Sequence, residues 1–534
     1  MRPSAVTGVV LLPVGAGLLA TALPAFGYWP AIGANALSLA PWRALCAWPG
    51  AGRAILLTLW TGCAATLLAA GTAILLAYGC TRPEFARMAR RVLPGVLATP
   101  HAALAIGLAF LVAPSGWIAR LASPWLTGWA TPPDLVITGD PWGLALIAGL
   151  WIKEAPFLLL MLLAALGQAE PEAGLRVAMA LGYGPARGWL LAVLPRAWRQ
   201  MRLPALAVLA FSCSAVEVAL VLGPSEPPTL AVLALRLMTN ADFRAWLPGS
   251  AAAVLLCAVT AVAGGIVWAV ERCVAQAGMA VLRRGWRGGS GRGVATAAAA
   301  IGGGLAVIAA GSLLVLLVWS FAGSWRFPAA WPEQWSAKVW SVQGPGLVRP
   351  AVTTLLLGVT SAGLAVALAV TWLQGGRGGV ALAYVPLLVP QAGFVFGLQN
   401  VLAVLGLDSS VAGVVWAHLV YTLPYAMLAL ADPWAALDGR YARAAACLGA
   451  SPWRVLRRVV LPLLARPLLA AGAVAFAVSA GLYLPTLFAG GGRWDTLTLE
   501  AIALASGGDR RVLGATALLQ AALPLAVFAV AVRR

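Results

Sequence analysis

The residues of this 534-residue chain best placed to do chemistry are two carboxylates within strongly apolar stretches, Glu154 (beside Lys153) and Glu217. A charge in such a stretch is costly unless it faces a partner or water, so each predicts either a cation-attracting lining or a buried, paired group. His101 and His418 have no neighbouring ligands to complete a metal site, and we expect them to be hydrogen-bonded packing residues. The sequence contains no nucleophile–base set and no G-x-x-x-x-G-K-[ST] loop, so it predicts no catalytic residue, no metal site and no ATP site.

A polar segment occurs twice. Arg176-Val-Ala-Met-Ala-Leu-Gly182 precedes Pro195, and Arg443-Ala-Ala-Ala-Cys-Leu-Gly449 precedes Pro462, with 13 residues from Gly to Pro each time. Pro185 and Pro452 keep the same offset of 267 residues. We expect a short helix ended by a left-handed Gly, then a second helix started by Pro. An interfacial helix on lipid headgroups explains one such segment but not the repeated spacing, so we predict two docking points for a two-fold partner.

The composition indicates a membrane protein. The chain is 61% hydrophobic and 10% charged, with a mean hydropathy of +0.90. A soluble protein cannot bury that much apolar surface, whereas runs of about 20 apolar residues cross a bilayer as helices. The net charge of +19 would suggest nucleic acid for a soluble domain, but here Lys and Arg lie mainly between apolar runs, so we predict no nucleic-acid partner. Tryptophans near span ends, Trp117 and Trp325 among them, are expected to form an aromatic belt.

Twelve helical spans are predicted. Their approximate ranges are 5–28, 53–79, 92–113, 143–166, 203–223, 247–270, 296–321, 351–373, 380–405, 411–431, 467–489 and 513–532. If both termini and the loops after even-numbered spans share one side, that side holds 24 of the 36 Lys and Arg and is predicted to be cytoplasmic. Both repeated segments fall on it.

The duplication continues inside the predicted spans. Pro100-His-Ala102 leads to Gly107, and Pro390-Gln-Ala392 leads to Gly397, with identical spacing. Ser214-Ala215 is paired with Ser479-Ala480. Six spans separate the copies, an even number, so the prediction is two parallel six-helix repeats, 1–270 and 296–534, joined by a basic, Gly-rich linker at 271–295.

These motifs carry a resemblance to a known family. Ala-Ala-x-x-Leu-Gly followed by Leu-Pro resembles the EAA loop of the permeases of binding-protein-dependent ABC importers, type I, and two such loops in one chain resemble the fused branch that includes thiamine and iron(III) transporters. The predicted loops are 167–202 and 432–466. The family's leading Glu is replaced by Arg176 and Arg443, so the partner should carry a compensating charge.

The resemblance implies the partners and the site residues. Two cytosolic ATPase subunits, which carry ATP and Mg²⁺, would grip the loops, and a periplasmic binding protein would deliver a small solute, with the loop from Pro114 to Trp142 as a candidate receiving surface. The ATPase-coupling residues would be Arg176, Val177, Ala178, Leu181, Gly182, Pro185, Pro195, Arg443, Ala444, Ala445, Leu448, Gly449, Pro452 and Pro462. The solute pathway would use Glu217, Glu154, Ser214, Ser479 and Tyr483. The chain would be a multi-pass protein of the bacterial inner membrane that binds no cofactor itself. A thiamine-like cation is the favoured solute, with ferric iron next.

An ion-gradient-driven secondary transporter with six plus six spans is the alternative, because it uses the same parallel duplication. It gives no reason for the paired loops. A membrane enzyme is a third class, and no cluster of His, Asp and Glu supports it.

Overall fold

The computed structural model describes residues 3–168, 171–288, 290–376 and 380–533. Residues 169 and 170 of the first predicted loop, Gly289 of the predicted linker, and three arginines of the charge count (Arg2, Arg377 and Arg534) lie outside the described residues. The prediction of an all-α polytopic membrane protein is confirmed. The described part has nine helices that are long and apolar enough to cross a membrane, or up to twelve if each of three bent pairs is one span.

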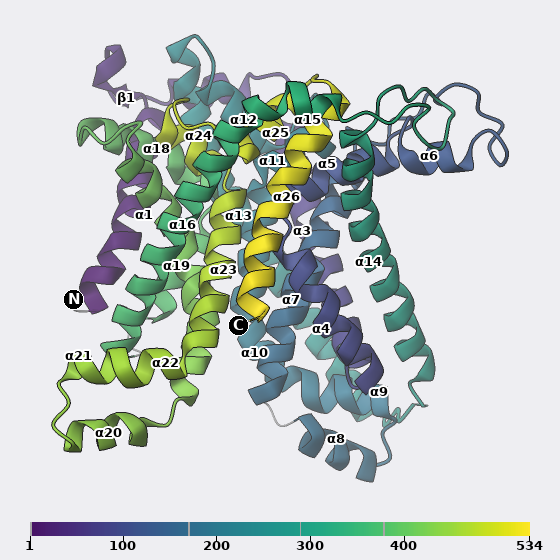
Figure 1. Ribbon diagram of the computed structural model, residues 1–534, viewed down its shortest axis with the longest axis vertical. Helices are drawn as coiled ribbons and strands as arrows, with labels where there is room; N and C mark the ends of the chain where they lie inside the picture. Colours follow the sequence, from purple (N-terminus) through teal and green to yellow (C-terminus); the bar gives the residue numbers. More distant parts are fainter. Residues whose placement is uncertain (1–2, 169–170, 289, 377–379, 534) are drawn as a thin grey trace. The chain divides into compact units, whose positions relative to one another are not determined.

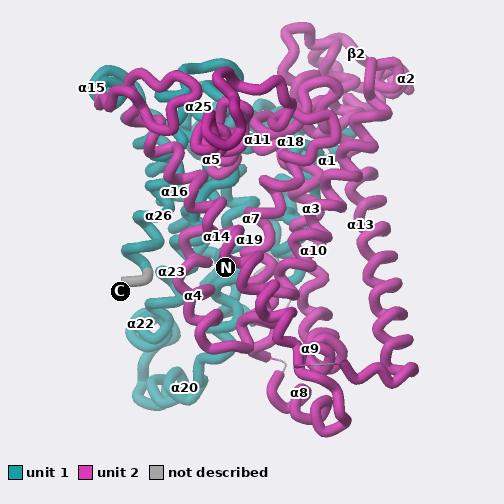
Figure 2. The backbone as a smooth tube through the Cα atoms, turned by 90° about the vertical axis from the view of Figure 1, so that its right-hand side faces the viewer, with its two compact units in different colours: residues 1–23, 98–103, 338–534 teal, residues 24–97, 104–337 magenta. Residues whose placement is uncertain are grey.

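The chain forms two compact units, drawn separately in Figure 2. Unit 1 comprises residues 1–23, 98–103 and 338–534, and unit 2 comprises 24–97 and 104–337. The units therefore do not coincide with the two predicted sequence repeats. The first long helix of the chain packs with the later helices, and the helix that begins at Arg292 packs with the earlier ones.

Unit 2 begins in the chain with a small hairpin and continues as helices (Figure 1). Its elements are β1 (Tyr28–Trp29), η1 (Pro30–Ile32), β2 (Ala34–Asn35), α2 (Ala40–Cys46), α3 (Ala51–Gly79), α4 (Pro83–Ala98), α5 (His101–Val112), α6 (Trp117–Ala122), α7 (Leu144–Gln168), α8 (Pro171–Ala180), α9 (Pro185–Gly188), η2 (Trp189–Val193), α10 (Leu194–Ser214), α11 (Val216–Leu222), α12 (Leu230–Met238), η3 (Phe243–Ala245), α13 (Trp246–Arg283) and α14 (Arg292–Ser320); the ends of α4 and α5 around residues 98–103 belong to unit 1.

Every regular element among the described residues of unit 1 is a helix. Its elements are α1 (Pro3–Ala25, to residue 23), α15 (Lys338–Val342), α16 (Gly344–Gln374), η4 (Val380–Tyr384), α17 (Val385–Leu388), α18 (Gln391–Val404), α19 (Val411–Ala436), α20 (Gly439–Cys447), α21 (Pro452–Val455), η5 (Leu456–Val460), α22 (Leu461–Leu463), α23 (Ala465–Gly481), α24 (Leu484–Gly490), α25 (Leu497–Ala505) and α26 (Arg510–Arg533).

Two glycines singled out by the sequence are points of close helix approach. A Cβ at Gly107 of α5 would collide with the backbone of Ser312 in α14, within unit 2. A Cβ at Gly397 of α18 would collide with Gly17 and Thr21 of α1, within unit 1, and the Gly397 amide donates to Thr21 Oγ1 at 3.0 Å. The repeated Pro-to-Gly spacing therefore marks the place where α14 or α1 crosses.

The same threonine contact also occurs in each unit. Thr58 of α3 accepts a hydrogen bond from the Leu230 amide at the start of α12, at 2.9 Å. Thr354 of α16 accepts one from the Leu497 amide at the start of α25, also at 2.9 Å. Each threonine supplies an oxygen to an otherwise unpaired amide at a helix N-terminus, which is costly to leave unsatisfied in an apolar setting.

Four predicted elements differ from the structure. The span predicted at 92–113 is divided between amphipathic α4, whose arginines Arg87 and Arg90 are exposed, and the apolar α5. The predicted linker is largely helical, because α13 runs to Arg283 and α14 begins at Arg292. The spans predicted at 203–223 and 380–405 are bent pairs, by 52° and 100°.

Candidate functional site

The first repeated segment, named here the first loop (residues 171–193), folds into the predicted helix–turn–helix. At the end of α8, the Gly182 amide donates to Met179 at 2.9 Å and the Tyr183 amide donates to Ala178 at 3.1 Å. Gly182 has φ +84°, and α9 begins at Pro185. This is a Schellman ending, in which a left-handed residue lets the chain pair the last helix carbonyls.

The second loop (residues 439–460) repeats the turn bond for bond. The Gly449 amide donates to Ala446 at 3.0 Å and the Ala450 amide donates to Ala445 at 3.1 Å. Gly449 has φ +80°. α21 begins at Pro452, and Ser451 accepts from the Arg454 amide as the N-cap. All these turn residues lie 267 positions after their counterparts, so both predicted caps are present.

Each loop continues into one turn of π-helix, η2 or η5, again 267 residues apart. Pro195 and Pro462, which have no amide hydrogen to donate, follow directly after these π-turns inside continuous helical runs. π-Turns of this kind occur frequently at functional positions. In each unit the loop lies at the end of the long helices opposite to the short helices that follow the backbone breaks, α11 and α12 or α24 and α25 (Figure 1).

The predicted coupling residues divide by exposure. Ala178 is buried, and Ala445 packs on the apolar cluster of Val455, Val460 and Leu464. Leu181 is 59% exposed and its counterpart Leu448 is 89% exposed. The other exposed members of the predicted set are Arg176, Val177, Gly182, Pro195, Arg443, Ala444, Gly449, Pro452 and Pro462, while Pro185 is half-buried. Exposed apolar side chains that gather on one short segment, as Val177, Met179 and Leu181 do in the first loop, are typical of a protein-docking surface.

Charge differs between the loops at the position of the replaced Glu. Arg176 lies 3.6 Å from Glu172, one helical turn earlier, and both side chains are largely exposed. The position equivalent to Glu172 is Gly439, so Arg443 lacks that carboxylate. An exposed pair of this kind contributes little to stability, and both arginines remain available to a partner.

Of the two predicted intramembrane carboxylates, Glu154 lies on α7 and is buried. Its neighbour Lys153 donates from Nζ to the carbonyls of Val96 and Leu97, at 2.8 and 3.0 Å. These carbonyls lie in the last turn of α4, where a cation interacts favourably with the helix dipole. Lys153 therefore joins α7 to the end of α4.

Glu217 lies at a break in the backbone. α10 ends at Ser214, Ala215 adopts an extended conformation with ψ 100°, and α11 begins at Val216. Glu217 is buried in the first turn of α11, where the amide dipoles favour a carboxylate. Ser214 donates its hydroxyl to the Ala210 carbonyl at 2.7 Å.

The equivalent break in unit 1 is at Leu482, with ψ 117°. Tyr483 follows it and is half-buried. Because Ala215 and Leu482 are 267 residues apart, Ser479 corresponds to Ser212, and the predicted pairing of Ser479 with Ser214 is wrong by two residues. Both spans contain a Ser-Ala dipeptide, Ser214-Ala215 and Ser479-Ala480, but the two dipeptides are two residues out of register with each other.

His418 is a packing residue, as predicted. Its Nδ1 lies 2.7 Å from Ser479 Oγ and its Nε2 lies 3.0 Å from Thr486 Oγ1, all three residues being buried. Ser479 therefore joins α19 to α23 through this histidine. His101 is the first residue of α5 and is half-buried.

Two tryptophans predicted to lie in an aromatic belt are buried instead. Trp117 donates to the Ala330 carbonyl, and Trp325 stacks near the guanidinium of Arg120, 4.8 Å from its Cζ. Arg120 is itself buried and donates to the Arg326 carbonyl at 2.9 Å. This arginine, which no motif in the sequence marks, joins α6 to the loop after α14.

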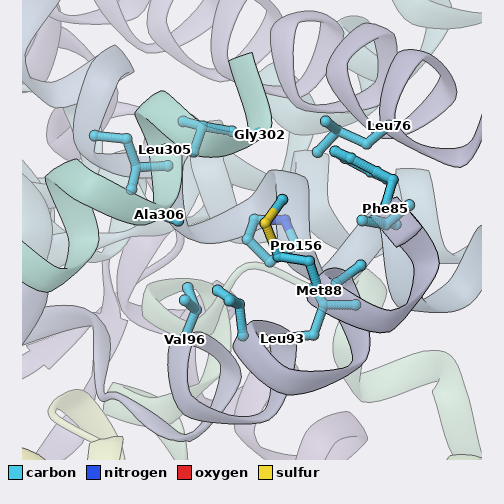
Figure 3. A pocket seen from close by; sticks show the side chains of 13 residues that line it. Leu76, Phe85, Met88, Leu93, Val96, Pro156, Gly302, Leu305 and Ala306 are labelled. Carbon is cyan, nitrogen blue, oxygen red and sulfur yellow. The ribbon is translucent and has the colours of Figure 1, made fainter. Parts of the chain in front are cut away.

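Unit 2 also contains an apolar pocket with about 540 Å³ of non-protein space, part of it open to the outside (Figure 3). Phe85, Met88 and Leu93 of α4 face Leu76 of α3 and Leu305 of α14 across it. Its lining is almost wholly hydrocarbon. A cationic solute would lose its hydration there without gaining a polar partner, so the pocket does not suit a cation.

Comparison with known proteins points to the same family as the two loops. Residues 378–534 match the model of the family described as "Binding-protein-dependent transport system inner membrane component". The chain is 33% identical over 508 residues to the inner membrane ABC transporter permease protein YnjC of Escherichia coli (strain K12), covering 92% of this chain and 90% of that protein. The members of this family are transport components rather than enzymes, and they work with ATPase subunits. The chain therefore belongs to the family of multi-pass inner-membrane permeases of ABC transporters.

Proposed function

We propose that this chain is the fused, two-repeat permease of an ATP-driven importer and that one ATPase subunit docks on each loop. ATP and Mg²⁺ would be held by these two subunits, and the loops and both termini would face the cytoplasm. What supports the proposal is the pair of identical Schellman turns, each of which presents an exposed leucine, Leu181 or Leu448. Two equal docking points suit a two-fold motor, whose closure would open a path between the repeats.

The turn glycines provide the test. Gly182→Val with Gly449→Val places β-branched residues at φ +84° and +80° and should distort both turns while the spans still insert. Gly33→Val is the matched control, because Gly33 has φ +80° with no atom within 4 Å of its Cβ position, in a turn outside both loops. We expect the complex with the double variant to hydrolyse ATP on its ATPase subunits without solute uptake, and the complex with the control to transport normally. Full transport by the double variant would refute docking at the turns.

For the solute, we propose a thiamine-like cation, with ferric iron next, delivered by a periplasmic binding protein. What supports a cation is the burial of two carboxylates, Glu154 in the span-length helix α7 and Glu217 in the short helix α11, which completes a bent pair of span length. Uptake by Glu217→Gln should be weaker at every pH at which the carboxylate is ionised. Unchanged uptake across pH would assign Glu217 to packing. Identification of the molecule that co-purifies with the cognate binding protein would name the solute.

A further inference from the structure

A short segment between the long helices lies against the first loop. We call the described residues of Arg284–Gly291 the strut. The carbonyl of Arg287 accepts a hydrogen bond from the Gly184 amide at 2.8 Å, directly before α9. A Cβ on Gly182 would lie 3.3 Å from Arg287 Cδ, so the side chain of the same arginine covers the left-handed turn. Backbone and side chain of one strut residue thus hold both ends of the turn.

Two strut glycines are tightly placed against the same loop. A Cβ on Gly288 would lie 2.7 Å from Arg187 Cζ. A Cβ on Gly291 would collide with the Tyr78 hydroxyl and lie 2.9 Å from the Ala186 Cβ. Both glycines also have positive φ, +60° and +67°, which other residues rarely adopt. The path of the strut therefore depends on glycine for its conformation and for its contact with α9.

The second loop is held differently. Nothing lies within 4 Å of a Cβ built on Gly449. Ser451 is the residue equivalent to Gly184 of the first loop, and the Ser451 hydroxyl accepts a hydrogen bond from the Arg454 amide. Gly184 has no side chain to form such a cap, and the strut carbonyl bonds the Gly184 amide itself. One loop is fixed by a remote segment and the other by its own residue.

We propose that the strut is the positioning element of the first docking loop, and that an ATPase subunit bound there contacts Trp286 and Arg287 together with the loop. This inference rests on the proposed function. Trp286 is 53% exposed and Arg287 is exposed, beside the exposed Leu181. They add an aromatic ring and a positive charge to the surface, so the partner should present a carboxylate there. The two ATPase sites of one permease are then inequivalent.

Matched glycine variants test the proposal in the full complex. Gly291→Ala pushes a methyl group against Ala186, whereas Gly285→Ala places the same methyl at φ +63° in open space. A photo-cross-linking benzophenone residue is placed at position 181 or 448, and the complex is trapped with a non-hydrolysable ATP analogue. We expect Gly291→Ala to reduce ATPase cross-linking from position 181 by roughly tenfold, the change that corresponds to about 1.4 kcal/mol. Cross-linking from position 448 should not change, and Gly285→Ala should change neither.

A second measurement needs no partner. Hydrogen exchange of the Gly184 amide should accelerate in Gly291→Ala and not in Gly285→Ala, because the strut carbonyl protects it. Equal exchange in both variants, or an equal loss of cross-linking at positions 181 and 448, would overturn the strut as a positioning element of one loop. Absence of cross-linking from both positions in the unmodified permease would instead refute ATPase docking, and with it the proposed function.

Discussion

In the first loop, Gly188 lies so close to α8 that a Cβ there would be 3.0 Å from the Ala178 Cβ, whereas the second loop has Val455 at this position, packed with Val460 and Leu464. The turns themselves have the same hydrogen bonds. Residues within a few positions of the turn therefore determine its shape, whereas the residues packed against the loop differ between the two units. The same substitution should have the same effect in both turns, but substitutions of the residues packed against the loops should have different effects.

The helices that leave the loops differ as well. α10 runs unbroken from Leu194 to Ser214, whereas the chain turns by 78° at Leu464 between α22 and α23. If an ATPase subunit pushes on the loops, the push on the first loop would pass along one continuous helix. The push on the second would pass through a bend, where part of the displacement would change the angle between α22 and α23 instead.

The largest effect is expected from single turn variants. Gly182→Val and Gly449→Val each force a β-branched residue into the left-handed region, at a cost of about 1–3 kcal/mol. Uptake should fall about tenfold in each, since 1.36 kcal/mol corresponds to a factor of ten in rate. Only Gly182→Val should also displace Arg287 and expose the strut to trypsin. Equal protection of the strut in both variants would break the proposed difference between the loops.

The packing position inside the two loops should give the next largest effect. Gly188→Val overfills the contact with Ala178 and should destabilise the first loop by about 1–3 kcal/mol. Val455→Gly removes a buried side chain and should lower stability by about 2 kcal/mol, leaving a gap beside Val460. Thermal unfolding in detergent, with hydrogen exchange to localise the change, measures both. Tolerance of valine at position 188 would show that the two supports are alike.

A smaller effect is expected at the helix caps. Ser451→Ala removes the oxygen that accepts from the Arg454 amide and should destabilise the second loop by about 1 kcal/mol. Gly184→Ala should destabilise the first loop by less than this, because it removes no side-chain acceptor and the strut carbonyl still bonds the Gly184 amide. Amide exchange at Arg454 and Gly184 compares them. A larger loss at position 184 would contradict the assignment of the first cap to the strut.

The smallest effect is expected at the exposed charges. Arg176→Gln removes the 3.6 Å pair with Glu172 and should cost less than about 0.5 kcal/mol. Arg443→Gln breaks no equivalent pair and should leave the unfolding temperature unchanged. If Arg176→Gln unfolds several degrees lower in physiological salt, the pair holds the first loop more strongly than its exposure implies.

Local patterns in the sequence predicted most of the helices and both turns. Apolar runs located the spans, because a span needs only its own residues to be apolar. The Gly-to-Pro spacing predicted the left-handed caps at Gly182 and Gly449, because such a cap is formed within six residues. The repeated Gly107 and Gly397 were visible as a motif, but the helices they contact, α14 and α1, are hundreds of residues away and follow no local periodicity.

Long-range contacts were therefore the part that the sequence did not predict. The bond between Arg287 and Gly184 joins residues 103 positions apart, and nothing about a basic, Gly-rich segment distinguishes a strut from a flexible linker. The buried Arg120 looks in the sequence like any surface arginine, since the aromatic rings that cover it, among them Trp319 and Trp325, lie about 200 residues later in the chain. One feature of the sequence does point to an ordered strut, namely the three-residue spacing of Gly285, Gly288 and Gly291. In the structure all three glycines have positive φ.

Transport by purified permease in proteoliposomes tests the central claim most directly. The permease is reconstituted with and without its ATPase subunits, with binding protein and solute outside and with ATP or an ion gradient as the energy source. We predict uptake only when both the ATPase and ATP are present, and none from any ion gradient alone. Accumulation of solute driven by a proton or sodium gradient in vesicles that lack the ATPase would contradict the assignment of the two loops as docking points for a motor.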